Sequence, residues 1–338
     1  MISAFDYWEE NGKEVVARVY GRGVSALLPE KAGKITLREL ADHAFASSPS
    51  DEMVKKEIFR AVRREGSEAE NASGWTIGRA EDLPAPDDVL CGEKVEEIAL
   101  PASMSVVGNY AFYGCRNLAS LTFPPGRIRM GSGAFVDCGH IRKLTFTCLK
   151  GETDPPQLRE VLGDMNLEVE VTVTDGENTV LKLYYPGYYE DSVENTPARI
   201  FIMHFEGTGF KYRQCFKNGK IDFDQYDSLF YETSVQETTD TALRVAFDRL
   251  TWPVHLSQKS REKYFDFILT EYRAAAPVIL KEERTALLEI LCGSERMPKE
   301  IFEKFLETAR EMRSLEALGI LQEIRRKRFP AKKKEYRF

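Results

Sequence analysis

Three aspartates near the middle of the sequence come closest to forming an acid–base or cation-binding group. Asp222 and Asp224 are separated by one residue, and Asp227 follows shortly after. If this segment is a strand, alternation places Asp222 and Asp224 on one face, where paired carboxylates could bind a cation or transfer a proton. Ile221 and Phe223 would occupy the opposite face, as in an ordinary half-buried strand. We therefore expect a solvated strand face here, and an enzyme with a site in this β-rich part of the chain is the alternative.

No other residues have the spacing of a familiar catalytic or metal-binding motif. The four histidines are far apart and form no H-x-x-x-H pair: His43, His140, His204 and His255. The sequence has no C-x-x-C pair and no G-x-S-x-G motif. The Gly-x-Gly segments at Gly21 and Gly131 lack the third glycine of a phosphate-binding loop. We predict no catalytic residue, no metal site and no cofactor.

The densest aromatic group surrounds the turn-forming pair Pro186-Gly187. It consists of Tyr184, Tyr185, Tyr188 and Tyr189. Exposed tyrosines at such a turn could stack on a sugar or anchor a protein partner, because their rings supply contact area at little entropic cost. The alternative is that these rings pack against neighbouring strands. The same segment, together with Asp222 and Asp224, is where we would expect the site of an enzyme.

The elements that would position such side chains follow from an internal repeat of 23 residues. Its apolar positions occur three times: Val95, Ile98 and Leu100, then Leu118, Leu121 and Phe123, then Ile141, Leu144 and Phe146. Gly108, Ala111, Phe112 and Cys115 likewise recur as Gly131, Ala134, Phe135 and Cys138. The spacing predicts one short strand per unit, in which Ile98 and Leu100 point inward and Ala99 points outward. Each unit buries only part of its apolar face, so stacking of units must complete the core.

These units resemble the BspA-type leucine-rich repeat, whose pattern runs LP, IG, AF, GC and L-x-x-L. The first unit matches at Leu100-Pro101, Val107-Gly108, Ala111-Phe112 and Gly114-Cys115, whereas the second departs at Asp137-Cys138. A degenerate unit precedes them at Leu28-Pro29, Ile35, Leu37, Leu40 and Ala44-Phe45. The resemblance covers about residues 15 to 150. It implies a short solenoid that serves protein interaction, or extracellular adhesion in some members of the family.

The resemblance also implies a concave face lined by the outward strand positions. These positions are Glu96, Glu97, Ala99, Ala119, Ser120, Thr122, Arg142, Lys143 and Thr145. The face would be acidic at one edge and basic at the other, which suits a polar protein or peptide partner.

Together with the remaining chain, the repeats predict an α+β protein. It consists of a short BspA-type leucine-rich-repeat solenoid, extended by a β-rich segment and followed by an all-helical C-terminal domain. We expect the repeat domain at 1–150, with an inserted helix at about 50–66 behind the cap Ser50 and a surface loop at 67–90. The β-rich segment, 151–236, includes strands at 167–173, 179–185 and 200–205 and a hairpin at 210–223. It would extend or cap the repeat sheet.

The C-terminal part is expected to form a helical hairpin array or bundle at 237–328, followed by a basic tail at 329–338. Amphipathic periodicity predicts helices at 239–250, 257–275, 283–292, 298–313 and 315–328. The short connections between them favour antiparallel pairs.

Composition and charge narrow the function classes. The chain is 43% hydrophobic and 30% charged, as in ordinary globular proteins. A net charge of -7 argues against a nucleic-acid-binding surface, although the basic run from Arg325 to Arg337 is a local exception. No apolar run is long enough for a membrane span, and the N-terminus has no secretory signal, so we expect a cytoplasmic protein with reduced cysteines. The leading hypothesis is a non-enzymatic scaffold that binds an unidentified protein or peptide, and the alternative to an intracellular scaffold is an exported adhesin-like protein.

Overall fold

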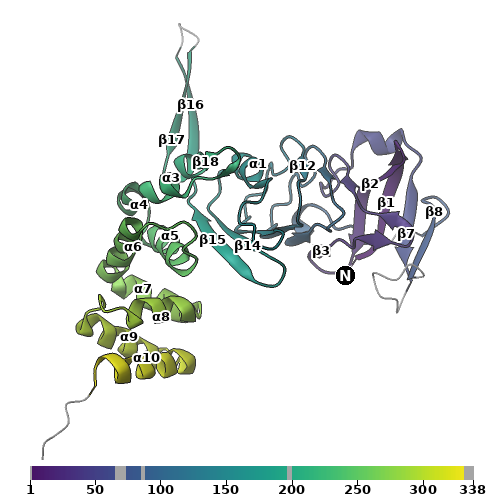
Figure 1. The fold of residues 1–338 in the computed structure, drawn as a ribbon. Helices are drawn as coiled ribbons and strands as arrows, with labels where there is room; N and C mark the ends of the chain where they lie inside the picture. The colour runs from purple at the N-terminus through teal and green to yellow at the C-terminus, as the bar shows by residue number, and fades with distance from the viewer. Residues whose placement is uncertain (1, 65–73, 85–87, 196–199, 331–338) are drawn as a thin grey trace, which may run out of the picture. The chain divides into compact units, whose positions relative to one another are not determined.

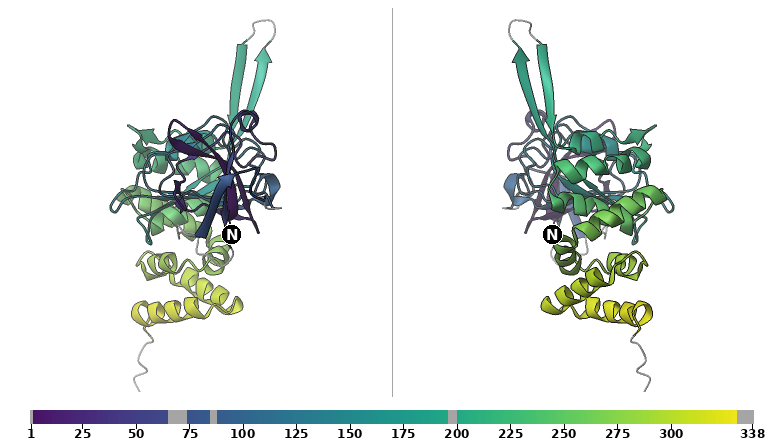
Figure 2. Two further views of the ribbon diagram at one scale, coloured as in Figure 1. Left: turned by 90° about the vertical axis from the view of Figure 1, so that its right-hand side faces the viewer. Right: turned by 90° about the vertical axis from the view of Figure 1, so that its left-hand side faces the viewer.

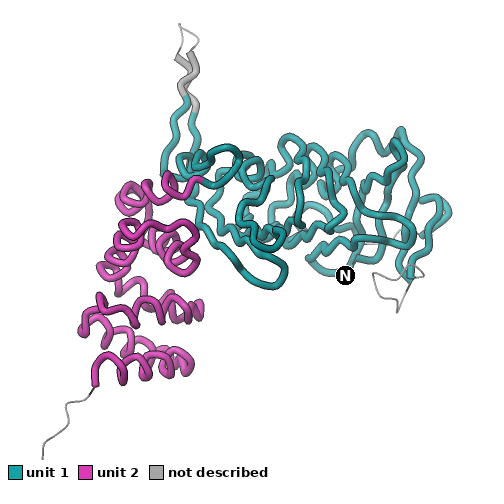
Figure 3. The backbone as a smooth tube through the Cα atoms, in the orientation of Figure 1, with its two compact units in different colours: residues 1–221 teal, residues 222–338 magenta. Residues whose placement is uncertain are grey.

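The computed structural model describes residues 2–64, 74–84, 88–195 and 200–330, with the backbone alone for 192–195 and 200–202. The chain divides into two compact units, residues 1–221 and 222–338 (Figure 3). Unit 1 contains the β-structure and two short helices, and unit 2 is helical (Figure 1). The expected fold class, a β-solenoid followed by a helical region in a mixed α+β protein, is confirmed.

Unit 1 is built around a six-stranded sheet whose strand order is β15-β14-β13-β11-β9-β3. The strands are β3 (Ser25–Leu27), β9 (Glu97–Ala99), β11 (Ser120–Phe123), β13 (Lys143–Thr147), β14 (Val169–Thr174) and β15 (Thr179–Tyr185). The first five are parallel, and β15 returns antiparallel. Ile98 pairs with Leu121 and Leu121 with Leu144, which confirms the 23-residue period.

The degenerate first unit and the β-rich segment both belong to this sheet. Ala26 on β3 pairs with Ile98, so the first unit stacks directly on the tandem pair although 72 residues separate the two partners. Val171 on β14 pairs with Leu144, and β15 closes the sheet. The predicted extension of the solenoid is therefore confirmed.

The core of the solenoid consists of columns of equivalent side chains. Phe123 and Phe146 stack with ring centroids 4.7 Å apart, and on the opposite wall Phe112 lies between Phe45 and Phe135 at 5.8 and 5.6 Å. Cys115 and Cys138 are buried free thiols that donate to the carbonyls of Phe45 and Phe112. Burial keeps these thiols neutral and raises the pKa of Cys138 to about 12.

The opposite wall of the solenoid joins an N-terminal sheet. The short strands β6 (Glu39–Leu40), β10 (Val106–Val107) and β12 (Arg129–Met130) pair in parallel, and β6 also pairs with β2. The sheet continues through β2 (Lys13–Gly21), β1 (Ile2–Glu10), β7 (Phe59–Arg63) and β8 (Trp75–Arg79). A buried pair holds it together: Arg60 donates to both carboxylate oxygens of Asp6 at 2.6 and 2.9 Å, and Tyr20 donates to one of them at 2.8 Å.

The prediction of a helix at about 50–66 is wrong. Ser50 does cap a helical turn, but the turn is a single 3-10 element, Asp51–Val54, and β7 follows it. Val54, assigned to the apolar stripe, is 88% exposed. Pairing with β7 gives the edge of β1 its backbone partners and buries Arg60 against Asp6, whereas a helix over these residues would leave that edge of β1 open and Asp6 without a cationic partner. Strand β8 likewise replaces part of the loop expected at 67–90, of which 67–73 and 85–87 lie outside the described residues.

Smaller elements complete unit 1. They are β4 (Lys31–Ala32), β5 (Ile35–Thr36), a 3-10 turn (Gly92–Lys94), α1 (Leu158–Gly163), β16 (Tyr189–Asn195), β17 (Ile200–Glu206), α2 (Gly209–Tyr212), β18 (Phe216–Lys217) and β19 (Lys220–Ile221). Strands β16 and β17 form a separate antiparallel ribbon that projects from the rest of the unit (Figures 1 and 2). The hairpin predicted around Asn218-Gly219 is present but shorter than expected.

A buried arginine fixes the end of the solenoid. Arg213 donates to the carbonyls of Met165, Leu167, Pro186 and Gly209, at 2.9 Å for Met165 and 2.7 Å for Pro186. Burial lowers the pKa of Arg213 to about 10, because the charge is removed from water. These hydrogen bonds join the segments around β14 and β15 to α2.

Unit 2 consists of eight helices in its described part. They are α3 (Phe223–Ser228), α4 (Phe230–Gln236), α5 (Thr239–Thr251), α6 (Gln258–Thr270), α7 (Tyr272–Lys281), α8 (Thr285–Gly293), α9 (Lys299–Glu311) and α10 (Leu315–Arg328). The helix expected at 257–275 is two helices, because the backbone leaves helical geometry at Glu271. Helices α7 and α9 pack together, as do α8 and α10, and the turns within the pairs α7–α8 and α9–α10 contain the left-handed residues Glu283 and Arg313.

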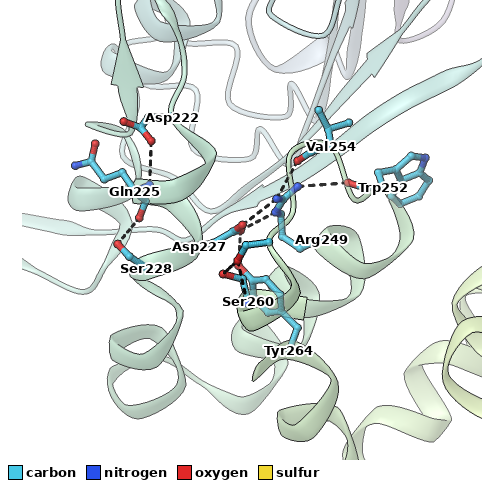
Figure 4. Close-up of polar contacts among 10 residues, drawn as sticks. Asp222, Gln225, Asp227, Ser228, Arg249, Trp252, Val254, Ser260 and Tyr264 are labelled. Atoms are coloured by element: carbon cyan, nitrogen blue, oxygen red, sulfur yellow. Dashed lines mark hydrogen bonds and ion pairs between the residues drawn. The ribbon is translucent and has the colours of Figure 1, made fainter. Parts of the chain in front are cut away.

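The three aspartates do not lie on a strand. Asp222 caps α3 by accepting the amide of Gln225, and Asp224 is exposed in the first turn of that helix (Figure 4). Asp227 is 3% exposed, so the expectation of a solvated face fails for it. The fully buried Arg249 donates to both oxygens of Asp227 at 2.7 and 3.0 Å, and Tyr264 donates at 2.7 Å (Figure 4).

Candidate interaction surface

Two rows of outward side chains cross the six-stranded sheet, and we call them the outer rows. The first is Ser25, Glu97, Ser120, Lys143, Glu170 and Tyr184. The second is Leu27, Ala99, Thr122, Thr145, Thr172 and Lys182. Because neighbouring strands lie about 4.8 Å apart, each row spans roughly 24 Å. The buried residues between them, such as Leu121, face the core and hold the rows in position.

The outer rows are polar and only partly ion-paired. Ser25 donates to Glu97 at 2.9 Å, and Lys182 forms an ion pair with Glu170 at 3.0 Å. Lys143 is exposed and has no ion-pair partner among the described residues. Leu27 is 58% exposed at one edge and supplies an apolar spot. The surface can thus offer hydroxyl, carboxylate and ammonium groups beside one apolar anchor.

The structure brings together the strand residues that the sequence placed on this face. Glu97, Ala99, Ser120, Thr122, Lys143 and Thr145 lie in the outer rows. Glu96, Ala119 and Arg142 precede the strands and are exposed. Their backbones are linked, since the amide of Ala119 donates to the carbonyl of Glu96 and the amide of Arg142 to the carbonyl of Ala119. The sequence reasoning did not include Glu170, Thr172 and Lys182, although the alternation in Val169–Thr174 was a visible signal.

The four tyrosines do not form one patch. Tyr184 is half-buried in the first outer row, whereas Tyr185 on the other face of β15 is fully buried and is unavailable to a ligand. Tyr188 packs edge-on against Phe210 at 5.7 Å, and Tyr189 is 63% exposed at the start of β16. The prediction of one aromatic surface is therefore wrong, because side chains alternate along β15 and place Tyr184 and Tyr185 on opposite faces.

The other candidate residues also lie apart. His43 stacks on Tyr110, His140 contacts the carbonyl of Arg116, and His255 packs against Phe223. Within the ranges that the structure describes, no three His, Cys, Asp or Glu side chains are grouped so that they could hold a metal ion. Over the same ranges, no helix has both the length and the apolar character needed to cross a membrane.

Stacked parallel strands of 23-residue units, closed by short strands on a second wall, define a leucine-rich-repeat solenoid. Residues 86–152 match the family model described as "BspA type Leucine rich repeat region (6 copies)". The chain therefore contains a BspA-type leucine-rich-repeat region, as its motifs indicated. Repeats of this family are typically scaffolds without catalytic activity and suggest a protein-interaction or adhesin-like role. No curated protein and no solved structure matches the chain.

Proposed function

We propose that the protein is a non-enzymatic scaffold that binds a polar protein or peptide across the outer rows. The observation that supports this proposal is the continuity of both rows over six strands, which doubles the width expected from three repeat units. A stable protein interface buries about 800 Å² on each partner, and a wide sheet face approaches this area more closely than three strands could.

The chemistry of the rows indicates how a partner would be recognised. The partner would place an apolar residue on Leu27, a carboxylate near Lys143, and hydrogen-bonding groups along Thr122 and Thr145. Small, half-buried threonines allow close approach, and the charges set the orientation of the partner more than its affinity. Substitution of Thr122 by arginine would therefore obstruct binding without touching the core.

The test is affinity purification of the full chain from its native host, with quantitative comparison of four forms. Wild type and the control Arg129→Glu, which changes an exposed residue of β12, should capture the same partner. Thr122→Arg and Lys143→Glu should lose that partner at unchanged thermal stability. Identical capture by all four proteins would refute binding at the outer rows.

We further propose that this scaffold works in the cytoplasm. Five of the six cysteines are buried free thiols and the sixth, Cys91, is free and half-buried, which suits a reducing compartment. Fractionation of native cells separates this proposal from the adhesin-like alternative. Recovery of the protein on the cell surface would favour adhesion.

A further inference from the structure

Two hollows lie beside the turns that connect β10 to β11 and β12 to β13, residues 108–117 and 131–140, and we call them together the groove. The first, of about 480 Å³, lies between His43, Tyr113 and Arg116, and the second, of about 360 Å³, lies between Val136, Asn166 and Tyr188. Asp137 lines both hollows. Volumes of this size suit small ligands.

Each hollow has an aromatic ring that its neighbours hold in place. Tyr113 is 41% exposed and stands edge-on to His43, with centroids 6.1 Å apart and planes at 73°. Tyr188 is held by Phe205 and Phe210, whose ring centroids lie 6.0 and 5.7 Å from its own, and by the guanidinium of Arg213, 5.1 Å from its ring centroid. These rings therefore offer binding surfaces whose orientation is set before a ligand arrives.

Asp137 occupies a position where the preceding repeat has glycine. Its counterpart one period earlier is Gly114, and the two residues have similar left-handed φ values of 61° and 71°. Glycine adopts this conformation without strain, whereas a residue with a side chain does so at a cost. Asp137 is exposed and makes no hydrogen bond or ion pair with any residue that the structure describes. The fold thus keeps a strained carboxylate on the lining of the two hollows without using it for its own stability.

The side chains around Asp137 select the class of ligand. The guanidinium of Arg116, the amide of Asn166 and the carboxylate of Asp137 offer both donors and acceptors. Glu93 forms an ion pair with Arg116 at 3.4 Å and balances its charge, so Asp137 and Glu190 leave the lining acidic, which disfavours phosphates and nucleic acids. Flat aromatic rings beside such polar groups match a sugar ring, whose C–H face packs on the aromatic face while its hydroxyls form hydrogen bonds.

We propose that this groove binds a linear saccharide of neutral sugars. Tyr113 stacks on one sugar ring, Tyr188 contacts another with the part of its ring that lines the second hollow, and Asp137 accepts hydrogen bonds from hydroxyls of the unit between them. This site lies on the turns, separate from the outer rows, so that the solenoid carries two binding surfaces.

The proposal is tested by applying the full chain to an array of neutral oligosaccharides and titrating the retained ones by calorimetry. Asp137→Gly restores the residue of the preceding repeat, so the midpoint of thermal unfolding should stay equal or rise while affinity falls at least about tenfold. Tyr113→Ala should weaken binding by a similar factor. The control Tyr231→Ala removes a tyrosine that is 75% exposed in α4 and should bind as wild type.

Three outcomes would overturn the proposal. The first is that no oligosaccharide on the array is retained by the wild-type chain. The second is that Asp137→Gly and Tyr113→Ala bind like the wild type. The third is that a peptide displaces the saccharide and depends on the outer-row residue Thr122 instead of Asp137, since binding would then belong to the sheet.

Discussion

Asp227 accepts hydrogen bonds from Arg249 and Tyr264 in a part of unit 2 that is closed to water. Burial opposes the charged form of Arg249, but the hydrogen bonds and charge of Asp227 more than compensate, so the pKa of Arg249 is raised. In unit 1, Asp6 and Arg60 form a similar pair with Tyr20. At the scale of residues, the buried carboxylates of Asp227 and Asp6 therefore stabilise the fold.

Removal of the charge from Asp227 should destabilise unit 2 strongly. Asp227→Asn leaves Arg249 buried without a counter-ion, and breaking a buried pair in this way costs about 3–5 kcal/mol. Urea unfolding followed by far-ultraviolet circular dichroism measures the change. Asp224→Asn, at an exposed position of the same helix, is the control and should change stability by less than about 0.5 kcal/mol. Equal effects of both variants would contradict the structural role of Asp227.

Alkaline solution should destabilise unit 1, because unfolding lets several of its buried tyrosine and cysteine side chains lose their protons. Burial raises the pKa of Tyr7 and, with the hydrogen bond to Asp6, that of Tyr20 to about 12, and burial does the same for Cys138. These groups ionise more easily in the unfolded chain, so the stability they provide is complete below their unfolded pKa values, about 8.5 for cysteine and 10 for tyrosine. It is then lost as the pH rises toward 12. Denaturant midpoints measured from pH 7 to 11 should fall above about pH 9, and a constant midpoint would refute the expectation.

At the scale of elements, the solenoid depends on close contact between successive turns. Gly108 and Gly131 occupy equivalent positions one period apart. A Cβ atom added at Gly131 would lie 2.3 Å from the carbonyl carbon of Gly108, and one at Gly108 would lie 2.5 Å from the backbone of Ala41. Glycine is therefore required at this position because the backbones of neighbouring units touch there, and this is the physical basis of the glycine in the repeat motif.

Gly131→Ala should separate two turns of the solenoid and destabilise unit 1 by about 2 kcal/mol or more, as overpacking does. Thermal unfolding of the full chain measures the effect. The matched control is Gly139→Ala in the same turn region, where an added Cβ has no atom within 4 Å and the backbone is not left-handed. A similar loss of stability in both variants would mean that helix or turn propensity, and not stacking, is responsible.

At the scale of the whole molecule, two compact units predict two cooperative transitions. Unit 1 has its own core of stacked phenylalanines, and unit 2 has its own buried pair Asp227–Arg249. Differential scanning calorimetry of the full chain should resolve two components. Gly131→Ala should shift one component, Asp227→Asn the other, and the effects in the double variant should add, since the sites share no partner. A single transition shifted by both variants would show that the units unfold together.

The sequence by itself determined the repeat. Its inward rows, its stacked phenylalanines and its outward residues on β9, β11 and β13 follow from a strict 23-residue recurrence. A recurrence of this kind can be read locally, because each unit contacts only its neighbours. Alternation was also sufficient to predict β14 and β15, and amphipathic periodicity was sufficient for most helices of unit 2.

Only the tertiary structure decided the conformation and burial of segments whose partners lie far away in the sequence. Residues 59–63 have a plausible helical stripe, yet they form β7 because β1 offers a strand edge and Asp6 a partner for Arg60. The sequence around Asp227 suggests a surface carboxylate, but in the structure Asp227 is buried in an ion pair with Arg249. The position of Asp137 on the lining of two hollows is likewise known only from the structure. The reason is the same in each case: local pattern reports which faces are apolar, whereas burial and pairing over long sequence distances depend on the assembled chain.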